Sequence, residues 1–331
     1  MRIPRPLLLT VTLAAILGSI FYLEAQKAPT STVVQTDNST TYKELVDPSG
    51  FINTEAFQIS DYIGKKVILI DFWTYSCINC IRTQPYLNAW WDEYEDDGLL
   101  IIGVHTPEFE FEKDYANVEA AVQKFGVEYP VVLDNNKGTW KAYGNRYWPR
   151  KYLIDLSGQI VFDHIGEGSY DETEEEIQKA LGLNEDMAEV ETESMDLNQI
   201  ESPEVYFGTQ RNEYLANGEE GEQGVQTLTI PEETGSNLLY LGGVCDFAEE
   251  YAETQNEATV LFNYSAKNVY MVGSAAESTT IEVYVDGVLE RTIEVQKEEL
   301  YQLVEGETYG EHSLELRIKG RGVKMFTFTF G

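Results

Sequence analysis

The sequence predicts an α/β domain followed by an all-β sandwich, behind an apolar N-terminal segment. Between residues 46 and 183, short apolar runs alternate with segments whose apolar residues recur every three or four positions, which is typical of strands alternating with helices. From residue 203 to 331 the runs alternate apolar and polar residues without helical spacing, which is typical of a β-sandwich or jelly roll. Residues 184–202 are acidic, contain no aromatic residue, and are predicted to be a linker.

The composition is that of a folded chain with a strongly acidic surface. With 331 residues the chain is long enough for about two domains, and its hydrophobic content of 43% excludes a disordered protein. A net charge of −34 repels polyanions, so we expect no nucleic acid and no anionic lipid as partner. The three cysteines and three histidines form no cluster with zinc-site spacing, so we expect no metal.

The N-terminus has the pattern of an export signal. Two arginines precede an uncharged apolar stretch from Leu7 to Leu23, which is typical of a secretory leader or a single membrane anchor. Cleavage after Ala25 is disfavoured because Leu23 stands where a small residue is preferred. We therefore expect residues 1–24 to be an uncleaved signal anchor, with a cleaved signal peptide as the alternative. Residues 25–45 then form a flexible tether, and the rest is extracytoplasmic.

The α/β domain is predicted element by element from its apolar spacing. Val67–Phe72 is a continuous apolar run, as expected for a strand covered on both faces. The next apolar residues fall on one helical face as far as Tyr94, and Gly98 ends that helix. Further strands are expected at 57–59, 99–104, 131–133, 151–154 and 159–165, and further helices over 118–125 and after Ser169.

The all-β domain is predicted from short alternating runs and one turn signal. Asp286-Gly287, between two such runs, is a strong hairpin signal. The last run makes the C-terminus a strand of the sheet. The runs lie at 225–230, 259–262, 280–285, 313–318 and 325–330.

Cys77 and Cys80, two residues apart between a strand and a helix, predict a dithiol redox centre. Cys77 lies where backbone N–H groups and the helix dipole stabilise a thiolate, so it is the expected nucleophile. Cys80, one turn further on, is placed to resolve a mixed disulfide. The alternative is a pair of unrelated core thiols, which an oxidising compartment disfavours. A disulfide that closes so short a loop adds little stability, so a purely structural bridge between Cys77 and Cys80 is not expected.

The stretch around these cysteines resembles thioredoxin. Asp71-Phe72-Trp73 precedes Cys77-Ile78-Asn79-Cys80, and Pro85 follows at the position of thioredoxin's helix-kinking proline. The resemblance is stronger to exported, membrane-tethered proteins of the TlpA and ResA type, and strongest to the thioredoxin-like part of DipZ proteins, which a β-rich, carbohydrate-module-like domain follows. It is carried by residues 72–80, 102–109, 129–134, 145–155, 203–208 and 326–331.

The resemblance implies roles for further residues. Asp71 corresponds to the buried acid that moves protons to and from Cys80, whereas a strand-end cap is the alternative interpretation. Pro149 corresponds to the cis-proline that faces the active disulfide, and Trp148 presents its backbone to the substrate. The resemblance implies no cofactor other than the redox-active disulfide Cys77–Cys80.

Four positions depart from the best-known relatives and leave the direction of electron flow open. Ser76 replaces a tryptophan, Ile78-Asn79 replaces a Gly-Pro pair, and Thr83 replaces the acid of ResA-like proteins. Reduction of protein disulfides is favoured by resemblance, with cytochrome c maturation as a possible setting. A multi-helix membrane electron conduit needs several apolar segments, and this sequence shows one. A separate, CcdA-like membrane thiol reductase is therefore the expected electron donor.

Two other functional classes stay open. Thr74-x-x-Cys77 is the peroxiredoxin pattern, so a thiol peroxidase is an alternative, although Ile70 stands where a proline is expected. The β domain is also compatible with a module that binds a cell-wall glycan or a protein.

The histidines and the third cysteine are not assigned to the redox centre. His105 and Glu108, just after a predicted strand, are expected either to line the substrate groove or to lie in a solvated loop. His164 and Cys245 are expected to be structural.

Overall fold

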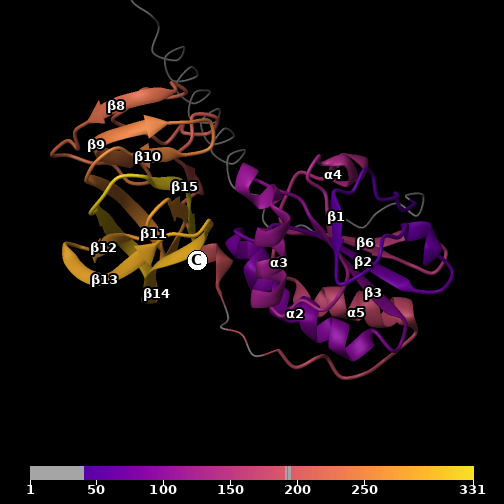
Figure 1. Cartoon of the computed structure of the whole chain (residues 1–331). Helices are drawn as coiled ribbons and strands as arrows, with labels where there is room; N and C mark the ends of the chain where they lie inside the picture. The colour runs from indigo at the N-terminus through magenta and orange to yellow at the C-terminus, as the bar shows by residue number, and fades with distance from the viewer. Residues whose placement is uncertain (1–40, 191, 193–194) are drawn as a thin grey trace, which may run out of the picture. The chain divides into compact units, whose positions relative to one another are not determined.

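A computed structural model describes residues 41–190, 192 and 195–331, which form an α/β lobe and a β lobe (Figure 1). The predicted anchor at residues 7–23 lies outside the described residues, as does most of the predicted tether. Within the described part, no helix is long and apolar enough to cross a membrane. The end of the predicted tether packs on the first lobe: the Tyr42 amide donates to the Gly158 carbonyl at 3.0 Å, and Leu45 is buried.

The first lobe is built on a six-stranded mixed sheet in the order β1-β4-β3-β2-β5-β6. The central strands β2, β3 and β4 run parallel, whereas β5 runs antiparallel to β2. Every residue of β2 is buried, as its sequence, apolar except for Asp71, predicts. The strands are β1 (Gly50–Ile52), β2 (Val67–Trp73), β3 (Leu99–His105), β4 (Val131–Leu133), β5 (Arg150–Ile154) and β6 (Ile160–Ile165).

Helices cover both faces of this sheet, so the lobe has two apolar cores. One core joins Leu69 of the sheet to Trp90, Val118 and Ile177 of three helices. The other core, which contains Ile70, is formed with the opposite face of the sheet. The helices are α2 (Ile78–Tyr94), α3 (Tyr115–Lys124), α4 (Gly138–Ala142) and α5 (Tyr170–Leu181), with 3-10 turns η1 (Ile59–Asp61) and η2 (Glu110–Lys113).

The structure differs from the sequence prediction at short elements. In this lobe, the run expected as a strand at 57–59 leads instead into η1. The spacing also does not predict strand β1 or the short helix α4. Helix α3 begins at Tyr115, because the Asp114 side chain accepts a hydrogen bond from the Ala116 amide at 2.8 Å and caps the helix. β1, η1 and α4 are too short for apolar spacing to reveal them.

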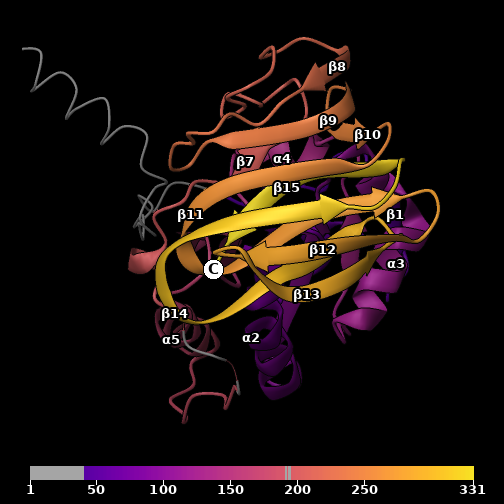
Figure 2. The ribbon, with the colours of Figure 1, turned by 90° about the vertical axis from the view of Figure 1, so that its left-hand side faces the viewer.

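The strands of the second lobe pair antiparallel in the order β13-β12-β14-β11-β15-β10-β9-β8, with β7 paired to β15. Its long strands β11 and β14 pair along most of their length and bend together (Figure 2). The strands are β7 (Val205–Tyr206), β8 (Gly224–Leu228), β9 (Leu239–Phe247), β10 (Ala252–Thr254), β11 (Ala258–Ala275), β12 (Thr279–Val285), β13 (Val288–Val295), β14 (Glu299–Ile318) and β15 (Val323–Phe330).

The β sheet folds back on itself around β11. The first part of β11 pairs with β9, whereas its last part pairs with β15, and β10 joins β9 to β15. Side chains enclosed by this turn of the sheet, such as Phe262 and Phe328, are fully buried. The hairpin predicted at Asp286-Gly287 is present between β12 and β13, and both residues have positive φ, 52° and 79°.

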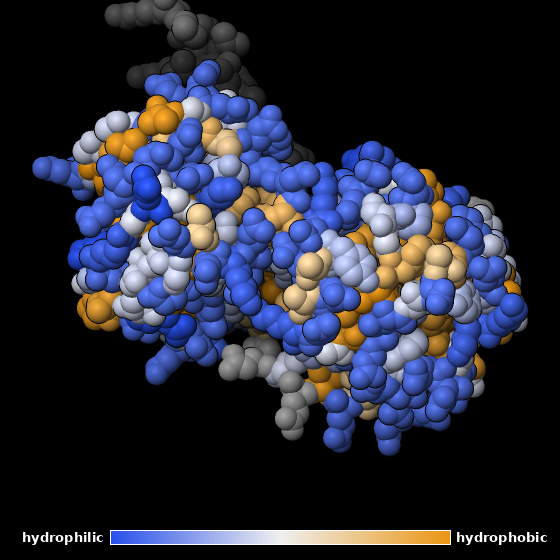
Figure 3. All heavy atoms as spheres, viewed as in Figure 1, coloured by the Kyte–Doolittle hydropathy of each residue, from blue (hydrophilic) through white to orange (hydrophobic). Residues whose placement is uncertain are grey.

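The surface fits the acidic composition. Polar residues cover most of the face seen in Figure 3, and apolar side chains show there mainly in small groups. Such a surface keeps a chain with a net charge of −34 hydrated.

Candidate redox site

The cysteine pair lies where the central strand β2 passes into helix α2. Cys77 is the N-cap residue of α2, and its amide donates to the Thr74 carbonyl at 3.4 Å. Its side chain is half-buried, whereas Cys80 in the first turn is only 1% exposed. Both are free thiols here. The geometry gives the two sulfurs different access to a protein substrate, with Cys77 outermost.

Burial also separates the two thiols chemically. It raises the pKa of Cys80 well above its ordinary value, and a hydrogen bond to Cys77 and the negative charges of Cys77 and Asp71 act in the same direction. Cys80 therefore holds its proton until a base removes it. A half-buried outer thiol at a helix N-terminus and a protonated inner thiol suit a nucleophile and a resolving cysteine, respectively.

Asp71 is a buried acid whose charge acts on Cys80. It lies inside β2 with 0% exposure, and burial raises its pKa to about 7 against the opposing charge of Lys151. A carboxyl group with that pKa can accept and return a proton near neutral pH. Neither carboxyl oxygen of Asp71 has a hydrogen-bond partner among the described residues. An acid left in this condition inside a strand is costly, which favours the catalytic over the capping interpretation.

Lys151 faces Asp71 from the neighbouring strand. The two residues are directly opposed in the β2–β5 pair, and the Lys151 Nζ lies 3.8 Å from the Asp71 Oδ1. Burial lowers the pKa of Lys151, while the charges of Asp71, Cys80 and Glu167 raise it. Sequence reasoning missed this lysine, although a charged residue in the apolar run 151–154 was a signal that could have found it.

The Trp148–Pro149 peptide bond is cis. The Trp148 indole N–H donates to the Thr106 carbonyl at 3.0 Å, and its ring packs on Trp140 with 4.3 Å between ring centroids. Both contacts fix the side chain of Trp148, and Pro149 is buried. Trp148 and Cys77 both pack, partly buried, against the same apolar core.

Arg82 and Glu167 form a bidentate ion pair beside the cysteines. The Arg82 Nε and Nη2 donate to the two Glu167 carboxylate oxygens at 2.7 and 2.6 Å, and Nη2 also donates to the Asn79 side-chain oxygen at 2.7 Å. The negative charge of Cys77 is among the causes that raise the pKa of Arg82. Arg82 therefore places a cation near the nucleophile. No local pattern pairs Arg82 with Glu167, because the two residues are far apart in the sequence.

His105 and Glu108 do not come together in an open groove. His105 ends β3 and is fully buried, and its ring stacks on that of Tyr75 with 5.8 Å between the ring centroids. Burial lowers the pKa of His105 to about 3. Glu108 instead forms an ion pair at 2.7 Å with Arg211 of the second lobe. His105 is therefore a neutral core residue, contrary to both expectations from the sequence.

His164 and Cys245 are buried, as expected of structural residues. Burial lowers the pKa of His164 to about 4 and raises the pKa of Cys245 to about 11. Cys245 belongs to the apolar core of the β lobe. Within the described residues, no group of three or more His, Cys, Asp or Glu side chains is arranged to hold a metal ion.

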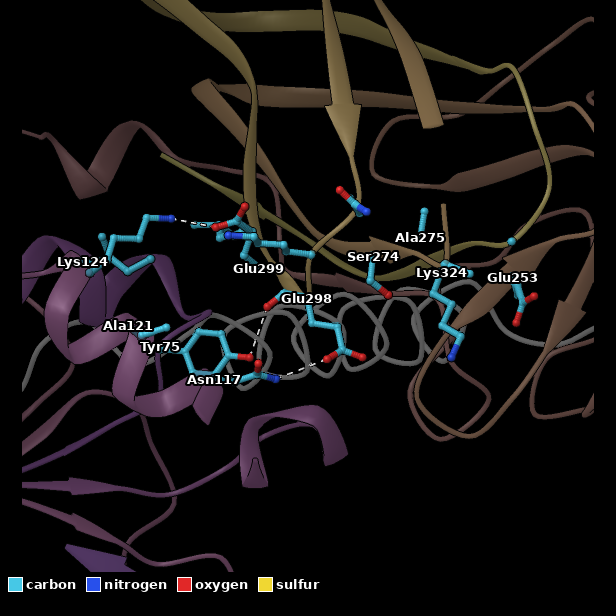
Figure 4. A pocket seen from close by; sticks show the side chains of 17 residues that line it. Tyr75, Asn117, Ala121, Lys124, Glu253, Ser274, Ala275, Glu298, Glu299 and Lys324 are labelled. Carbon is cyan, nitrogen blue, oxygen red and sulfur yellow. Dashed lines mark hydrogen bonds and ion pairs between the residues drawn. The ribbon is translucent and has the colours of Figure 1, made fainter. Parts of the chain in front are cut away.

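A cavity of about 620 Å³ is lined by Tyr75, which lies two residues before Cys77 in the sequence (Figure 4). Tyr75 and Asn117 of the first lobe line it, together with a β-lobe segment around Glu298; both lobes fall within a single compact unit. The Tyr75 hydroxyl donates to the Glu298 carbonyl at 3.2 Å, and the Asn117 amide donates to the Glu298 carboxylate at 3.3 Å. The β lobe thus borders the redox site.

Comparison with known proteins agrees with this geometry. Residues 33–163 match the AhpC/TSA family, and residues 202–331 match the family described as thioredoxin like C-terminal domain. Protein DipZ of Mycobacterium tuberculosis is 34% identical over 90% of this chain, which spans 44% of the length of DipZ. The thiol-disulfide oxidoreductase ResA of Geobacillus thermodenitrificans is 34% identical over 31% of this chain and 56% of its own length.

Solved structures also resemble part of this chain. One is a thioredoxin-like protein determined in solution in its oxidised form, 26% identical, which covers 42% of this chain and 96% of its own with a TM-score of 0.38. The redox lobe, with its cysteine pair, is thus similar to thioredoxin-like thiol–disulfide oxidoreductases. Over 90% of its length the chain is similar to protein DipZ.

Proposed function

We propose that the whole chain reduces disulfide bonds of exported proteins through Cys77 and Cys80. The observation that carries this is the pairing of an accessible Cys77 at the start of α2 with a buried Cys80 above the acid Asp71. The Cys77 thiolate attacks a substrate disulfide, whose S–S bond breaks to leave a mixed disulfide and one substrate thiolate. Asp71 then takes the Cys80 proton, and the Cys80 sulfur attacks Cys77.

This second attack releases the other substrate thiolate and closes the Cys77–Cys80 disulfide. Two electrons have then passed from the dithiol to the substrate, and the proton on Asp71 is available to the leaving thiolate. Trp148 and Pro149 are proposed to hold the substrate chain through their backbone. The cycle needs a dithiol donor to reduce the pair again, and we propose a CcdA-like membrane thiol reductase for that step.

The test is reduction of insulin disulfides by the purified full chain. The wild-type chain should precipitate insulin with a thiol donor present, and Cys77→Ser should abolish the activity. Cys80→Ser should instead accumulate a mixed disulfide with the substrate, because the resolving sulfur is missing. The matched control is Cys245→Ser, which removes the third thiol and should leave activity unchanged. Activity that survives Cys77→Ser would refute the mechanism.

We propose that the protein acts outside the cytoplasm, anchored by residues 7–23, with secretion after cleavage as the alternative. The support is the arginine-led apolar stretch in the sequence. Protease accessibility of the redox lobe in intact cells, together with its partition into the membrane fraction, tests both parts. Cytochrome c maturation is the proposed setting, and loss of covalent haem attachment on deletion of the gene tests it.

The proposed domain limits are 46–183 for the redox domain and 203–331 for the β domain, joined by the linker 184–202. We propose that the β domain is a sandwich of jelly-roll type that borders the substrate site and helps to select substrates. Its contacts with Tyr75 and Asn117 support the second part. Binding of a cell-wall glycan is the alternative role for this domain, and a glycan array with the full chain separates the two.

A thiol peroxidase remains the second candidate because of the match to the AhpC/TSA family and the Thr74-x-x-Cys77 pattern. In the structure the Thr74 hydroxyl lies 3.4 Å from the His105 Nε2. Consumption of hydrogen peroxide by the dithiol form, at a rate above that of insulin reduction, would favour this candidate.

A further inference from the structure

Glu112 is a second buried acid near the cysteine pair, hydrogen-bonded to the residue before Cys77. It lies in η2 with its side chain fully buried, and the Ser76 hydroxyl donates to its Oε1 at 2.6 Å. Ser76 directly precedes Cys77. A buried carboxylate is expensive to maintain without a function, and the dithiol mechanism described above does not use this one.

The hydrogen bonds around Glu112 fit the ionised carboxylate. Its Oε2 accepts from the amides of Glu108 and Phe109 at 2.6 and 2.9 Å, while Oε1 accepts from Ser76. A protonated acid would have to donate one hydrogen bond, whereas backbone amides can only donate to it. Burial raises the pKa of Glu112 and these hydrogen bonds oppose that rise. No ion pair to Glu112 is present among the described residues, so its charge is not neutralised locally.

We propose that Glu112 is a positioning residue that sets the redox equilibrium of the Cys77–Cys80 pair, by holding the Ser76 turn and keeping a buried negative charge beside the nucleophile. The inference rests on the proposed function, and it names a residue that favours electron flow from the dithiol to the substrate. A nearby anion destabilises the Cys77 thiolate, but it has no such effect on the uncharged disulfide. The dithiol form is therefore less favoured, and the pair becomes a stronger reductant.

The charges that face Glu112 from neighbouring elements do not cancel this effect. Glu108, in the loop after β3, raises the pKa of Glu112. The charge of Glu112 raises the pKa of Tyr75, in the loop after β2. Burial lowers the pKa of Lys137, which precedes α4, and the charge of Glu112 acts against this lowering. Lys137 is the cation in this group, and its ammonium lies over the Trp148 ring at 5.2 Å.

The test is the equilibrium of the full-length chain with reduced and oxidised glutathione, for wild type, Glu112→Gln, Glu112→Asp and Ser76→Ala. Glu112→Gln keeps the size of the side chain but removes its charge, so its equilibrium should move about tenfold toward the dithiol at pH values where Cys77 is a thiolate. The difference should vanish at acid pH, where Glu112 in the wild type is itself protonated. Glu112→Asp keeps the charge and should stay within about twofold of the wild type.

Ser76→Ala separates charge from structure, because it removes one hydrogen bond and leaves the carboxylate in place. A shift in Ser76→Ala as large as that in Glu112→Gln, or no shift in Glu112→Gln at any pH, would overturn the proposal. If Glu112→Gln does not fold, a reduced-minus-oxidised infrared difference spectrum of Asp71→Asn replaces it. A perturbed ionised carboxylate is then expected, and a protonated or silent one overturns the proposal. Glutathione equilibria do not require insulin turnover, so failure of the proposed reductase function would be seen separately.

Discussion

Lys151 and Asp71 form a buried pair in which the two charged groups approach to 3.8 Å without a hydrogen bond between them. At that separation the lysine favours the ionised acid, yet burial still holds the pKa of Asp71 at about 7. Asp71, the proposed proton acceptor for Cys80, is therefore near the midpoint of its titration at neutral pH. Because Lys151 lies two residues after Pro149, the proposed substrate-binding peptide leads directly into β5, the strand that carries Lys151.

Lys151→Met should move the pH dependence of the resolving step to higher pH. Removal of the cation leaves burial as the dominant influence, so the pKa of Asp71 should rise further above about 7. Stopped-flow measurement of mixed-disulfide breakdown against pH reports this midpoint. Arg150→Met is the matched control, since Arg150 is the adjacent cation and pairs with Asp163 instead. An unchanged midpoint in Lys151→Met would show that the lysine does not act on Asp71.

Asp71 should also make the stability of the fold depend on pH. Its pKa is raised in the folded state from 3.8 to about 7, so the folded chain binds more protons than the unfolded chain between these values. The free energy of unfolding should therefore fall as pH rises through this window. Relative to Asp71→Asn, the wild type should lose up to about 4 kcal/mol across it if this group alone titrates.

Urea denaturation of the wild type and Asp71→Asn at several pH values measures this difference. The comparison between variants removes the contribution of other titrating groups that both chains share. A difference in unfolding free energy that stays constant from acid to neutral pH would mean that the pKa of Asp71 is not raised by folding.

The sequence revealed those parts of the site that depend on local spacing. The apolar run of β2 and the two cysteines at the start of α2 are close in sequence, so their arrangement follows from local geometry. Glu112 and Lys151 could not be assigned in this way, because their partners Ser76 and Asp71 lie on other elements and are joined only by tertiary packing. These are also the groups that we propose adjust the chemistry of the cysteine pair.

The misassignment of His105 has a physical cause. A histidine after an apolar run suggests a strand end near solvent, but β3 continues through His105. Aromatic rings of Trp73 and Tyr75 then enclose the imidazole, at centroid distances of 5.1 and 5.8 Å. Only the packing of the loop after β2 decides this, and a single sequence does not show it.

Arg82→Met should destabilise the fold, because it leaves Glu167 as an unpaired carboxylate with only 9% side-chain exposure. The expected loss is about 1–3 kcal/mol, less than for a fully buried pair since Arg82 is partly exposed. The double variant Arg82→Met/Glu167→Gln should recover most of it, because no charge is then left unpaired. Chemical denaturation of the four chains of this cycle gives the coupling between the two residues. Additive effects would indicate that the ion pair contributes no net stability.

The central claim, that Cys77 and Cys80 form a reducing dithiol, is tested most directly by the reduction potential of this pair in the full chain. Equilibration with a glutathione buffer of known potential, followed by quantification of the dithiol and disulfide forms, gives the value. The account predicts a potential near that of thioredoxin, about −270 mV. A value near that of the oxidant DsbA, about −120 mV, would contradict it and reverse the proposed direction of electron flow.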